Sequence, residues 1–390
     1  MPTLDLEINE KVALLAFLLG LLFGAIGQRT NFCTMGAVSD WVNMGDKNRL
    51  RAWLLAIGVA ILATGYLQWS GPIDLQQSIY LTPNFGWLGH LLGGLLFGIG
   101  MTLASGCGQR TLVRIGGGNL KSLVVLLVLG ITAYMTLRGL LALVRVDLIE
   151  LANKDLTTLG LAGQGLPDML GRLAGIDDLR MLSLAVAVAL GGGLVAYSFA
   201  SVPFRRSFDD ILAGIAIGLI VAAGWYATGV AGFDDFEPTR LESFTFVAPT
   251  GESLMYLMTF TGSTIGFGVA AVFGVILGSF LYAVLSGRFR IEAFASTGDL
   301  ARHLVGAVLM GFGGVLSLGC TIGQGVTGMS TLAAGSLLTL VSIVFGSALT
   351  MKTEFHLLDE SGLPRALRLA LSDMHLAPRP GAGDDAGRAP

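Results

Sequence analysis

The chain is dominated by long apolar stretches that carry almost no charge. They cover approximately residues 11–27, 52–69, 88–106, 120–137, 181–199, 211–231, 255–285, 304–318 and 332–350. About 20 apolar residues in helical form cross the hydrocarbon layer of a bilayer, and several stretches approach that length. A membrane-spanning barrel would need alternating apolar and polar positions, whereas these stretches are continuous. The sequence predicts an all-α, polytopic membrane protein with about nine transmembrane elements, in which 255–285 forms two pieces.

Composition agrees with this class and excludes others. Only 13% of the 390 residues are charged and 53% are hydrophobic, against roughly a quarter charged in soluble domains. No basic cluster suggests a nucleic-acid partner. Three widely spaced cysteines without a CxxC motif favour neither a disulfide framework nor a zinc cage, so we expect no metal and no cofactor. The acidic start lacks the basic region of a signal peptide, and we expect the first helix to be retained.

Loop charge predicts the orientation, because cytoplasmic loops are enriched in Lys and Arg. Three basic clusters are predicted to be cytoplasmic: Lys47, Arg49 and Arg51; Arg205 and Arg206; Arg288 and Arg290. Loop 70–86 lacks Lys and Arg and loop 232–253 is acidic, so both are predicted to be external. Residues 352–390 are charged and then rich in Pro, Gly and Ala, which predicts a disordered tail.

One segment of the chain recurs. Residues 90–107 and 303–320 align without a gap and share nine of eighteen residues, including His90 with His303 and Cys107 with Cys320. The sequence therefore predicts a single membrane transport domain, 1–351, made of two repeat halves. About 10–137 and 255–350 carry the repeat, and 138–254 supplies connecting helices and loops. Inverted repeats are a frequent plan in transporters, with the substrate site at their interface, although the alignment alone leaves the relative orientation open.

All three cysteines lie in glycine-containing breaks at the ends of apolar stretches. The breaks read Gln-Arg-Thr-Asn-Phe-Cys33-Thr-Met-Gly, Ala-Ser-Gly-Cys107-Gly-Gln-Arg and Ser-Leu-Gly-Cys320-Thr-Ile-Gly-Gln-Gly. Irregular backbone at membrane depth occurs only where protein or a wet cavity surrounds it, so we expect helix–loop–helix hairpins that dip toward the membrane centre. Broken helices of this kind hold the substrate in many transporters.

The residue types at the breaks indicate a soft anion. A neutral thiol is a weak donor that matches a polarizable sulfur, whereas Arg side chains and amides match oxyanion oxygens. The predicted substrate-binding set joins the cysteines to their polar neighbours and adjacent glycines: Gln28, Arg29, Cys33, Thr34, Gly106, Cys107, Gly108, Gln109, Arg110, Gly319, Cys320, Thr321 and Gln324. Other readings are also open: the two arginines could lie at the membrane interface, and the glutamines could cap the broken backbone.

The three cysteine-centred motifs, and the chain from about 10 to 350, resemble the YeeE/YedE family of bacterial sulfur transporters. The resemblance implies a multi-pass inner-membrane protein that imports thiosulfate and is not an enzyme. It also implies that Cys33, Cys107 and Cys320 pass the substrate inward by transient S–H···S hydrogen bonds. A small cytoplasmic TusA-like sulfur carrier is the implied protein partner.

Two alternative functions are kept open. A transporter of the same kind could carry sulfite, a selenium oxyanion or another sulfur compound, because the family is also linked to selenium metabolism. A membrane thiol oxidoreductase would need cysteines that meet in space and exchange disulfides. The apolar stretches contain no prominent Asp or Glu, so the sequence indicates no coupling ion.

Overall fold

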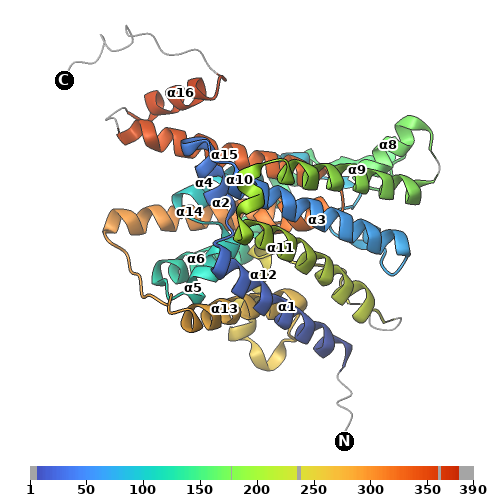
Figure 1. Ribbon diagram of the computed structural model, residues 1–390, viewed down its shortest axis with the longest axis horizontal. Coiled ribbons are helices and arrows are strands. Elements are labelled where there is room, and N and C mark those ends of the chain that lie inside the picture. The colour runs from blue at the N-terminus through green and yellow to red at the C-terminus, as the bar shows by residue number, and fades with distance from the viewer. Residues whose placement is uncertain (1–6, 177, 235–238, 359–361, 377–390) are drawn as a thin grey trace, which may run out of the picture.

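The computed structural model describes residues 7–176, 178–234, 239–358 and 362–376. Helices make up nearly all of its secondary structure, and β1 (Asn84–Phe85) and β2 (Lys154–Asp155) form a single short antiparallel pair within the described residues. Across those residues, nine spans are long and apolar enough to cross a membrane. The predicted all-α polytopic fold is therefore confirmed, and Figure 1 shows the long helices lying side by side.

The long helices are the following: α1 (Ile8–Thr30), α3 (Asn48–Ser70), α4 (Trp87–Leu103), α6 (Leu120–Arg138), α9 (Leu179–Phe199), α11 (Phe208–Tyr226), α13 (Phe267–Leu285), α14 (Thr297–Leu316) and α15 (Ala334–Leu358). Shorter helices are α2 (Thr34–Ser39), α5 (Gly108–Gly116), α7 (Leu141–Val144), α8 (Leu166–Ala174), α10 (Val202–Arg206), α12 (Val247–Met258) and α16 (Leu363–Asp373). Single 3₁₀ or π turns are η1 (Asp40–Met44), η2 (Leu75–Gln77), η3 (Arg145–Ile149), η4 (Glu150–Ala152), η5 (Leu156–Leu159), η6 (Ala227–Ala231), η7 (Phe260–Gly262) and η8 (Gly323–Gly328). As predicted, 255–285 is divided, here between α12 and α13.

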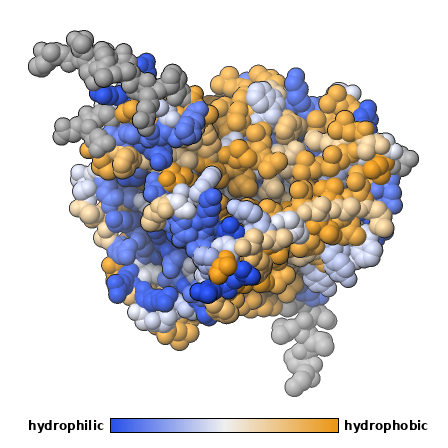
Figure 2. Space-filling view, turned by 45° about the horizontal axis from the view of Figure 1, so that its top comes forward, coloured by the Kyte–Doolittle hydropathy of each residue, from blue (hydrophilic) through white to orange (hydrophobic). Residues whose placement is uncertain are grey.

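The outer faces of the helices are apolar. On α1, for example, Leu14, Leu18 and Leu22 are exposed while Phe23 is fully buried. A helix that is hydrophobic all round lies either in a core or in lipid. Figure 2 shows a broad orange surface over the helices, with hydrophilic residues gathered toward the left of the view. The bundle therefore presents a lipid-facing belt.

Helices α4 and α14, which carry the sequence repeat, pack tightly against each other. A Cβ on Gly93 would lie 2.6 Å from the Gly313 carbonyl oxygen, and one on Gly100 would lie 2.6 Å from that of Gly306. Close approach of two backbones through small residues is typical of membrane helix pairs. Because the contacts pair an early residue of one helix with a late residue of the other, the helices run antiparallel. Equivalent helices of the two halves thus run in opposite directions, as in an inverted repeat.

The remaining helices extend this symmetry. α4 packs along α15 as α14 packs along α6, and α1 packs along α13 as α11 packs along α3. From this pairing we propose that α11 belongs to the second half, whereas the sequence assigns 138–254 to connecting segments. The repeat was hard to detect there because the equivalent helices share little sequence. α9 packs on α3 and stands outside the symmetric pairs.

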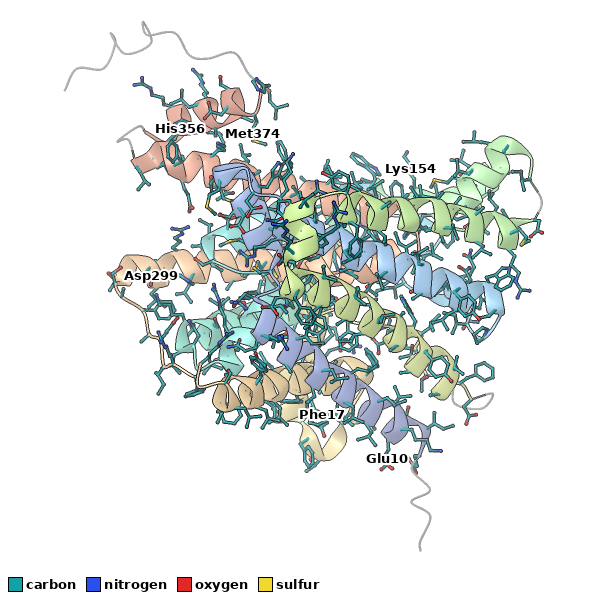
Figure 3. All side chains as sticks on the ribbon, viewed as in Figure 1. Glu10, Phe17, Lys154, Asp299, His356 and Met374 are labelled. Atoms are coloured by element: carbon teal, nitrogen blue, oxygen red, sulfur yellow. The ribbon has the colours of Figure 1, made fainter. Side chains whose placement is uncertain are left out.

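Basic residues collect at one end of the bundle. Arg29 at the end of α1 pairs with Asp209 at the start of α11 (3.2 Å), and Lys121 pairs with Asp299 (2.7 Å). In Figure 3 Asp299 lies at the end opposite Lys154. This is the end that the sequence predicts to be cytoplasmic, and it is called the basic end below.

The predicted tail starts later than expected. α15 continues to Leu358, and α16 (Leu363–Asp373) packs against it. Ala366 and Ala370 are fully buried in that contact, which explains why a charged segment forms a docked helix. The prediction of disorder from 352 is therefore wrong as far as residue 376, apart from 359–361, which like the rest of the tail lie outside the described residues.

Candidate functional site

The first break turns the chain at the basic end. α1 ends at Thr30, and Asn31 adopts a left-handed conformation with φ 54°. Cys33 then caps α2: its Sγ accepts a hydrogen bond from the Gly36 N–H at 3.5 Å. The thiol is thereby fixed at the start of a helix and is almost completely buried.

The second and third breaks are built alike. Ser105 (φ 56°) and Leu318 (φ 59°) are both left-handed, a conformation that costs a non-glycine residue roughly 1–2 kcal/mol. The Gly106 N–H donates to the Met101 carbonyl and the Gly319 N–H to the Gly314 carbonyl, each at 2.8 Å. Strain of this kind persists where the surrounding structure enforces it and is often found at functional sites. It aims Cys107 and Cys320 inward, and both are fully buried.

The three breaks meet inside the bundle. The Cys33 thiol lies close to the Cys107 thiol, and Cys107 in turn faces the hydroxyl of Thr321. Cys320 follows as the sequence neighbour of Thr321, and its thiol faces the hydroxyl of Thr245. The thiols and hydroxyls thus form a continuous row across the centre, called the thiol row below. Cys33 and Cys107 reach it from the basic end, and Cys320 and Thr245 reach it from the other.

Polar atoms along the thiol row have no hydrogen-bond partner. The hydroxyls of Thr245 and Thr321 and the Nη1 of Arg110 are buried, yet none makes a hydrogen bond among the described residues. The Thr34 hydroxyl is also unpartnered, but Thr34 lines a separate, mainly apolar cavity beside Trp53. An unsatisfied buried polar group costs about 1–3 kcal/mol. Three such groups near the cysteines mark a place where a polar ligand or water supplies the missing bonds.

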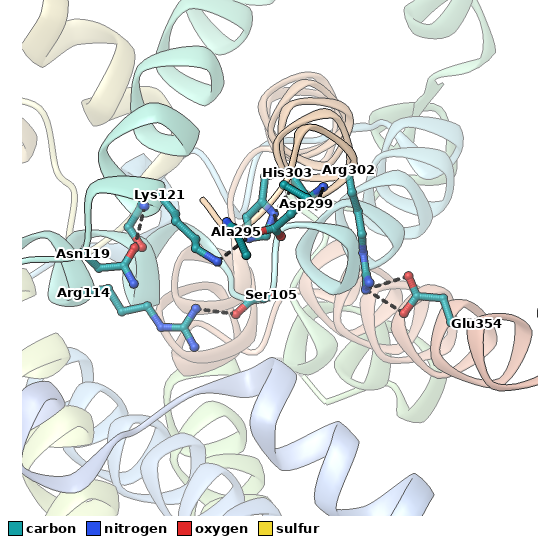
Figure 4. A network of polar contacts seen from close by, with 11 residues as sticks. Ser105, Arg114, Asn119, Lys121, Ala295, Asp299, Arg302, His303 and Glu354 are labelled. Atoms are coloured by element: carbon teal, nitrogen blue, oxygen red, sulfur yellow. Dashed lines mark hydrogen bonds and ion pairs between the residues drawn. The ribbon is translucent and has the colours of Figure 1, made fainter. Parts of the chain in front are cut away.

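Arg110 is the cation nearest the row. Its Nη2 donates to the Asn31 side chain at 2.8 Å, and its charge acts directly on the Cys33 thiol. It also lines a cavity of about 390 Å³ whose other basic residues include Arg114, Lys121 and Arg290. Figure 4 shows how Arg114 donates to the Ser105 carbonyl (2.7 Å) while Lys121 binds Asp299. The basic end of the row therefore opens toward a cationic vestibule.

The opposite end has a different character. Tyr80 is buried against Trp225, with ring centroids 6.2 Å apart, and lies close to both Cys320 and Glu242. Burial, together with the neighbouring Glu252, raises the pKa of Glu242 to about 7. This end therefore carries a carboxyl that titrates near neutral pH.

The predicted polar residues have different surroundings. Gln109 accepts from the Cys107 thiol at 3.8 Å and donates to the Phe32 carbonyl at 3.4 Å, so it joins two breaks. Both ends of the Gln324 amide are already bonded, to the Ser317 carbonyl and the Ser336 hydroxyl, and Gln324 braces its own loop. Gln28 lines the vestibule and accepts from Ser279.

Arg29 lies away from the row. Its guanidinium pairs with Asp209 and lies over the Phe208 ring, with 43% of the side chain exposed. Although Arg29 and Arg110 occur in the same Gln-Arg-Thr tripeptide, one ends a helix at the surface and the other begins a helix inside the bundle. The structure brings Arg110 to the thiols and leaves Arg29 at the edge.

The predicted glycines have unequal space. A Cβ on Gly108 would meet its nearest atoms at 3.9–4.0 Å, which is ordinary contact, whereas one on Gly319 would press on Gln324 at 3.2–3.3 Å. Gly106 is intermediate, with Arg110 at 3.4 Å. Of the three, Gly319 has the least room for a side chain.

Sequence reasoning missed Thr245, Tyr80 and Glu242. No motif marks them, because Thr245 stands where the first half has a cysteine, and Tyr80 and Glu242 lie in two separate loops. Within the described residues, no cluster of three or more His, Cys, Asp or Glu side chains could hold a metal ion.

Comparison with known proteins covers most of the chain. Residues 29–349 match the protein family described as sulphur transport. The thiosulfate transporter TsuA of Escherichia coli (strain K12) is 26% identical over 338 residues, which cover 84% of this chain and 90% of that protein. The thiosulfate transporter TsuA of Spirochaeta thermophila is 23% identical over 339 residues, covering 85% and 95%. The probable transporter YedE of E. coli is 32% identical over 101 residues, covering 25% of this chain and 23% of that protein.

Proposed function

The chain belongs to the sulphur-transport family, and from this premise we propose that it imports thiosulfate along the thiol row. Thiosulfate is a divalent anion with one soft terminal sulfur and three hard oxygens. Relatives that cover most of the chain are named thiosulfate transporters, and the polarizable sulfur atoms of the row suit the soft sulfur. The observation that carries the proposal is the proximity of Cys33 to Cys107, continued through Thr321 to Cys320.

The order of contacts follows from the two ends of the row. Lys and Arg mark the cytoplasmic side of a membrane protein, so the basic end is assigned to the cytoplasm and the protein to the inner membrane. Thiosulfate would enter beside Tyr80, meet Cys320, pass to Cys107 and leave past Cys33. Weak thiol hydrogen bonds assist such movement, because permeation needs sites that are shallow enough to leave.

The positive charge of the cationic vestibule attracts the anion at the cytoplasmic end of the row. Arg110 carries a buried, unpartnered N–H, and an intramembrane charge that faces a cavity attracts a counter-charge. Beyond it, the cytoplasmic face offers a place where a TusA-like sulfur carrier would accept the imported sulfur. The chain acts in this scheme as a transporter and not as an enzyme.

Uptake of labelled thiosulfate by an uptake-deficient bacterium tests the proposal. Cys107→Ala and Cys320→Ala should abolish uptake and growth on thiosulfate while the protein remains in the membrane. Unimpaired uptake by both variants would sink the proposal. Competition by unlabelled sulfite and selenite in the same assay separates thiosulfate from the alternative oxyanions, since a preferred substrate competes at the lowest concentration.

The proximity of Cys33 to Cys107 also suits the second candidate, a thiol oxidoreductase. Such an enzyme would cycle these cysteines between dithiol and disulfide. All three cysteines are free thiols in this structure. If the wild-type protein gave no thiosulfate uptake but showed a membrane thiol-oxidising activity that Cys33→Ser abolished, the oxidoreductase would replace the transporter.

A further inference from the structure

The inverted symmetry gives Cys33 a counterpart. Cys33 follows α1 and precedes α3, and it reaches the cysteine of its own half, Cys107. Thr245 follows α11 and precedes α13, the symmetry partners of α1 and α3, and it reaches Cys320. The thiol row therefore has four symmetric positions, of which three hold thiols and the fourth holds a hydroxyl.

The segment around Thr245 is held firmly in place. The Phe244 carbonyl accepts from the Thr327 hydroxyl at 2.6 Å, and the Phe244 ring stacks on Phe23 with centroids 5.6 Å apart. Phe246 on the other side packs edge-on against the same Phe23 ring. With both neighbours fully buried, the Thr245 side chain has a fixed direction.

That direction is toward the third break. A Cβ on Gly323 would collide with the Thr245 hydroxyl, so the glycine leaves the space that the hydroxyl occupies. The hydroxyl faces Cys320 but forms no hydrogen bond, and the fully buried Thr321 hydroxyl is also without a bond. The unpartnered Thr245 hydroxyl therefore lies beside Cys320, and the unpartnered Thr321 hydroxyl faces Cys107 from the residue next to Cys320.

We propose that Thr245 and Thr321 bind the oxygens of the transported anion while Cys320 binds its terminal sulfur. The inference rests on the proposed function and adds a division of labour to it. A hydroxyl donates well to a charged oxygen, and hydrogen bonds to charged groups are the stronger ones. The inner half, with Cys33 and Cys107, offers soft donors and the Arg110 charge. The outer half is thus the part that requires both a soft and a hard end on one anion.

This arrangement defines a substrate class. Sulfate has hard oxygens only and leaves the Cys320 thiol without a soft partner. Sulfide has a soft atom only and leaves both hydroxyls unpartnered. A site whose buried polar groups stay unpaired rejects the wrong ligand strongly, so the outer half should favour anions that combine a sulfane sulfur with a sulfonate group.

The experiment compares Thr245→Val with Thr245→Ser in labelled-thiosulfate uptake. Valine keeps the shape and removes the hydroxyl, and the KM should rise about tenfold or more with little change in protein level. Serine restores the hydroxyl and should return the KM to within about threefold of wild type. Thr64→Val is the matched control, because Thr64 is another fully buried, unpartnered threonine on α3, outside the row.

Thr321→Val and Thr321→Ser form a second pair in case valine at 245 prevents folding. An unchanged KM in both valine variants would overturn the inference, as would an equal loss in Thr64→Val. If Cys320→Ala abolishes uptake while the valine variants transport normally, the inference fails and the proposed function stands. If the cysteine variants also transport normally, the proposed function fails.

Discussion

The Nη2 of Arg110 donates a hydrogen bond to the Asn31 side chain at 2.8 Å, whereas its Nη1 is buried without a hydrogen-bond partner. Asn31 is the left-handed residue that ends α1, so the bond fixes the guanidinium against the first break. A second donor of the same rigid fork remains open beside Cys33. A guanidinium that is held in place by one nitrogen and can still donate from another is well suited to bind an anion.

Arg110→Gln should therefore abolish thiosulfate uptake. Arg110→Lys keeps the charge but loses the fork, and we expect uptake to fall about tenfold or more. The matched control is Arg29→Gln, since Arg29 lies in the same tripeptide but pairs with Asp209 at the surface. That variant should transport within about twofold of wild type, because exposed ion pairs contribute about 0–1 kcal/mol. Equal losses in both arginine variants would contradict the assignment.

Oxidation should join Cys33 to Cys107. Their thiols lie close together, so a mild oxidant such as diamide can remove two hydrogen atoms and form a disulfide. Mass spectrometry of the purified protein should find that cross-link and not one to Cys320. Uptake should stop on oxidation and return with dithiothreitol. In Cys33→Ser, uptake after diamide should equal the uptake of the same variant before diamide. A loss of uptake on oxidation of this variant would mean that the reactive cysteines are not Cys33 and Cys107.

External pH should modulate uptake through Glu242. Burial and the like charge of Glu252 raise its pKa to about 7, against the opposing effect of Arg240. Tyr80, whose own pKa is raised mainly by burial, also faces this carboxyl. Above about 7 the carboxylate is charged and repels the entering anion, whereas below it the group is neutral. Uptake should therefore rise as external pH falls through that value.

Two variants test the origin of this pH dependence. Glu242→Gln removes the titrating group, so its uptake should stay high across neutral pH. Glu252→Gln removes a like charge and should move the midpoint to lower pH, because the carboxyl of Glu242 then ionises more readily. A wild-type midpoint in both variants would exclude Glu242 as the group responsible.

Gly93→Ala should destabilise the bundle. Its new Cβ would lie 2.6 Å from both the Gly313 carbonyl oxygen and the Ser317 nitrogen, and overpacking of this kind costs about 1–3 kcal/mol. Gly192→Ala on α9 is the control, because no atom lies within 4 Å of its added Cβ. Thermal unfolding in detergent should show a lower melting temperature than wild type for Gly93→Ala. The melting temperature of Gly192→Ala should be unchanged. Equal melting temperatures would mean that α4 and α14 are not in close contact.

Some of this architecture could be predicted from the sequence. The apolar stretches predicted the nine spans, because in lipid every backbone group must be bonded within a helix. The repeat at Cys107 and Cys320 was visible since the same turn imposes the same glycines on both halves. The wider symmetry was not visible, because α1 and α11 need only be apolar and of similar length to occupy equivalent places.

The candidate site was predictable only where it contains a rare residue. Cysteine is rare in this chain, so each of the three cysteines could be proposed from its break alone. Thr245 could not, because threonine is common in membrane helices and only the contact with Cys320 distinguishes it. Gln324 was included for its amide, which the structure shows is bonded at both ends to Ser317 and Ser336.

The glycine contact between α4 and α14 has a consequence for the evolutionary origin of the two halves of the chain. Gly93 contacts Gly313, the repeat equivalent of Gly100, and Gly100 contacts Gly306, the repeat equivalent of Gly93. Each helix therefore presents the same surface to the other. An interface that matches itself is isologous, as in a two-fold symmetric dimer. A single ancestral polypeptide, inserted into the bilayer in both orientations, could have formed it before gene duplication joined the two copies. Separate expression of the two halves is then a direct way to ask whether the membrane still assembles them.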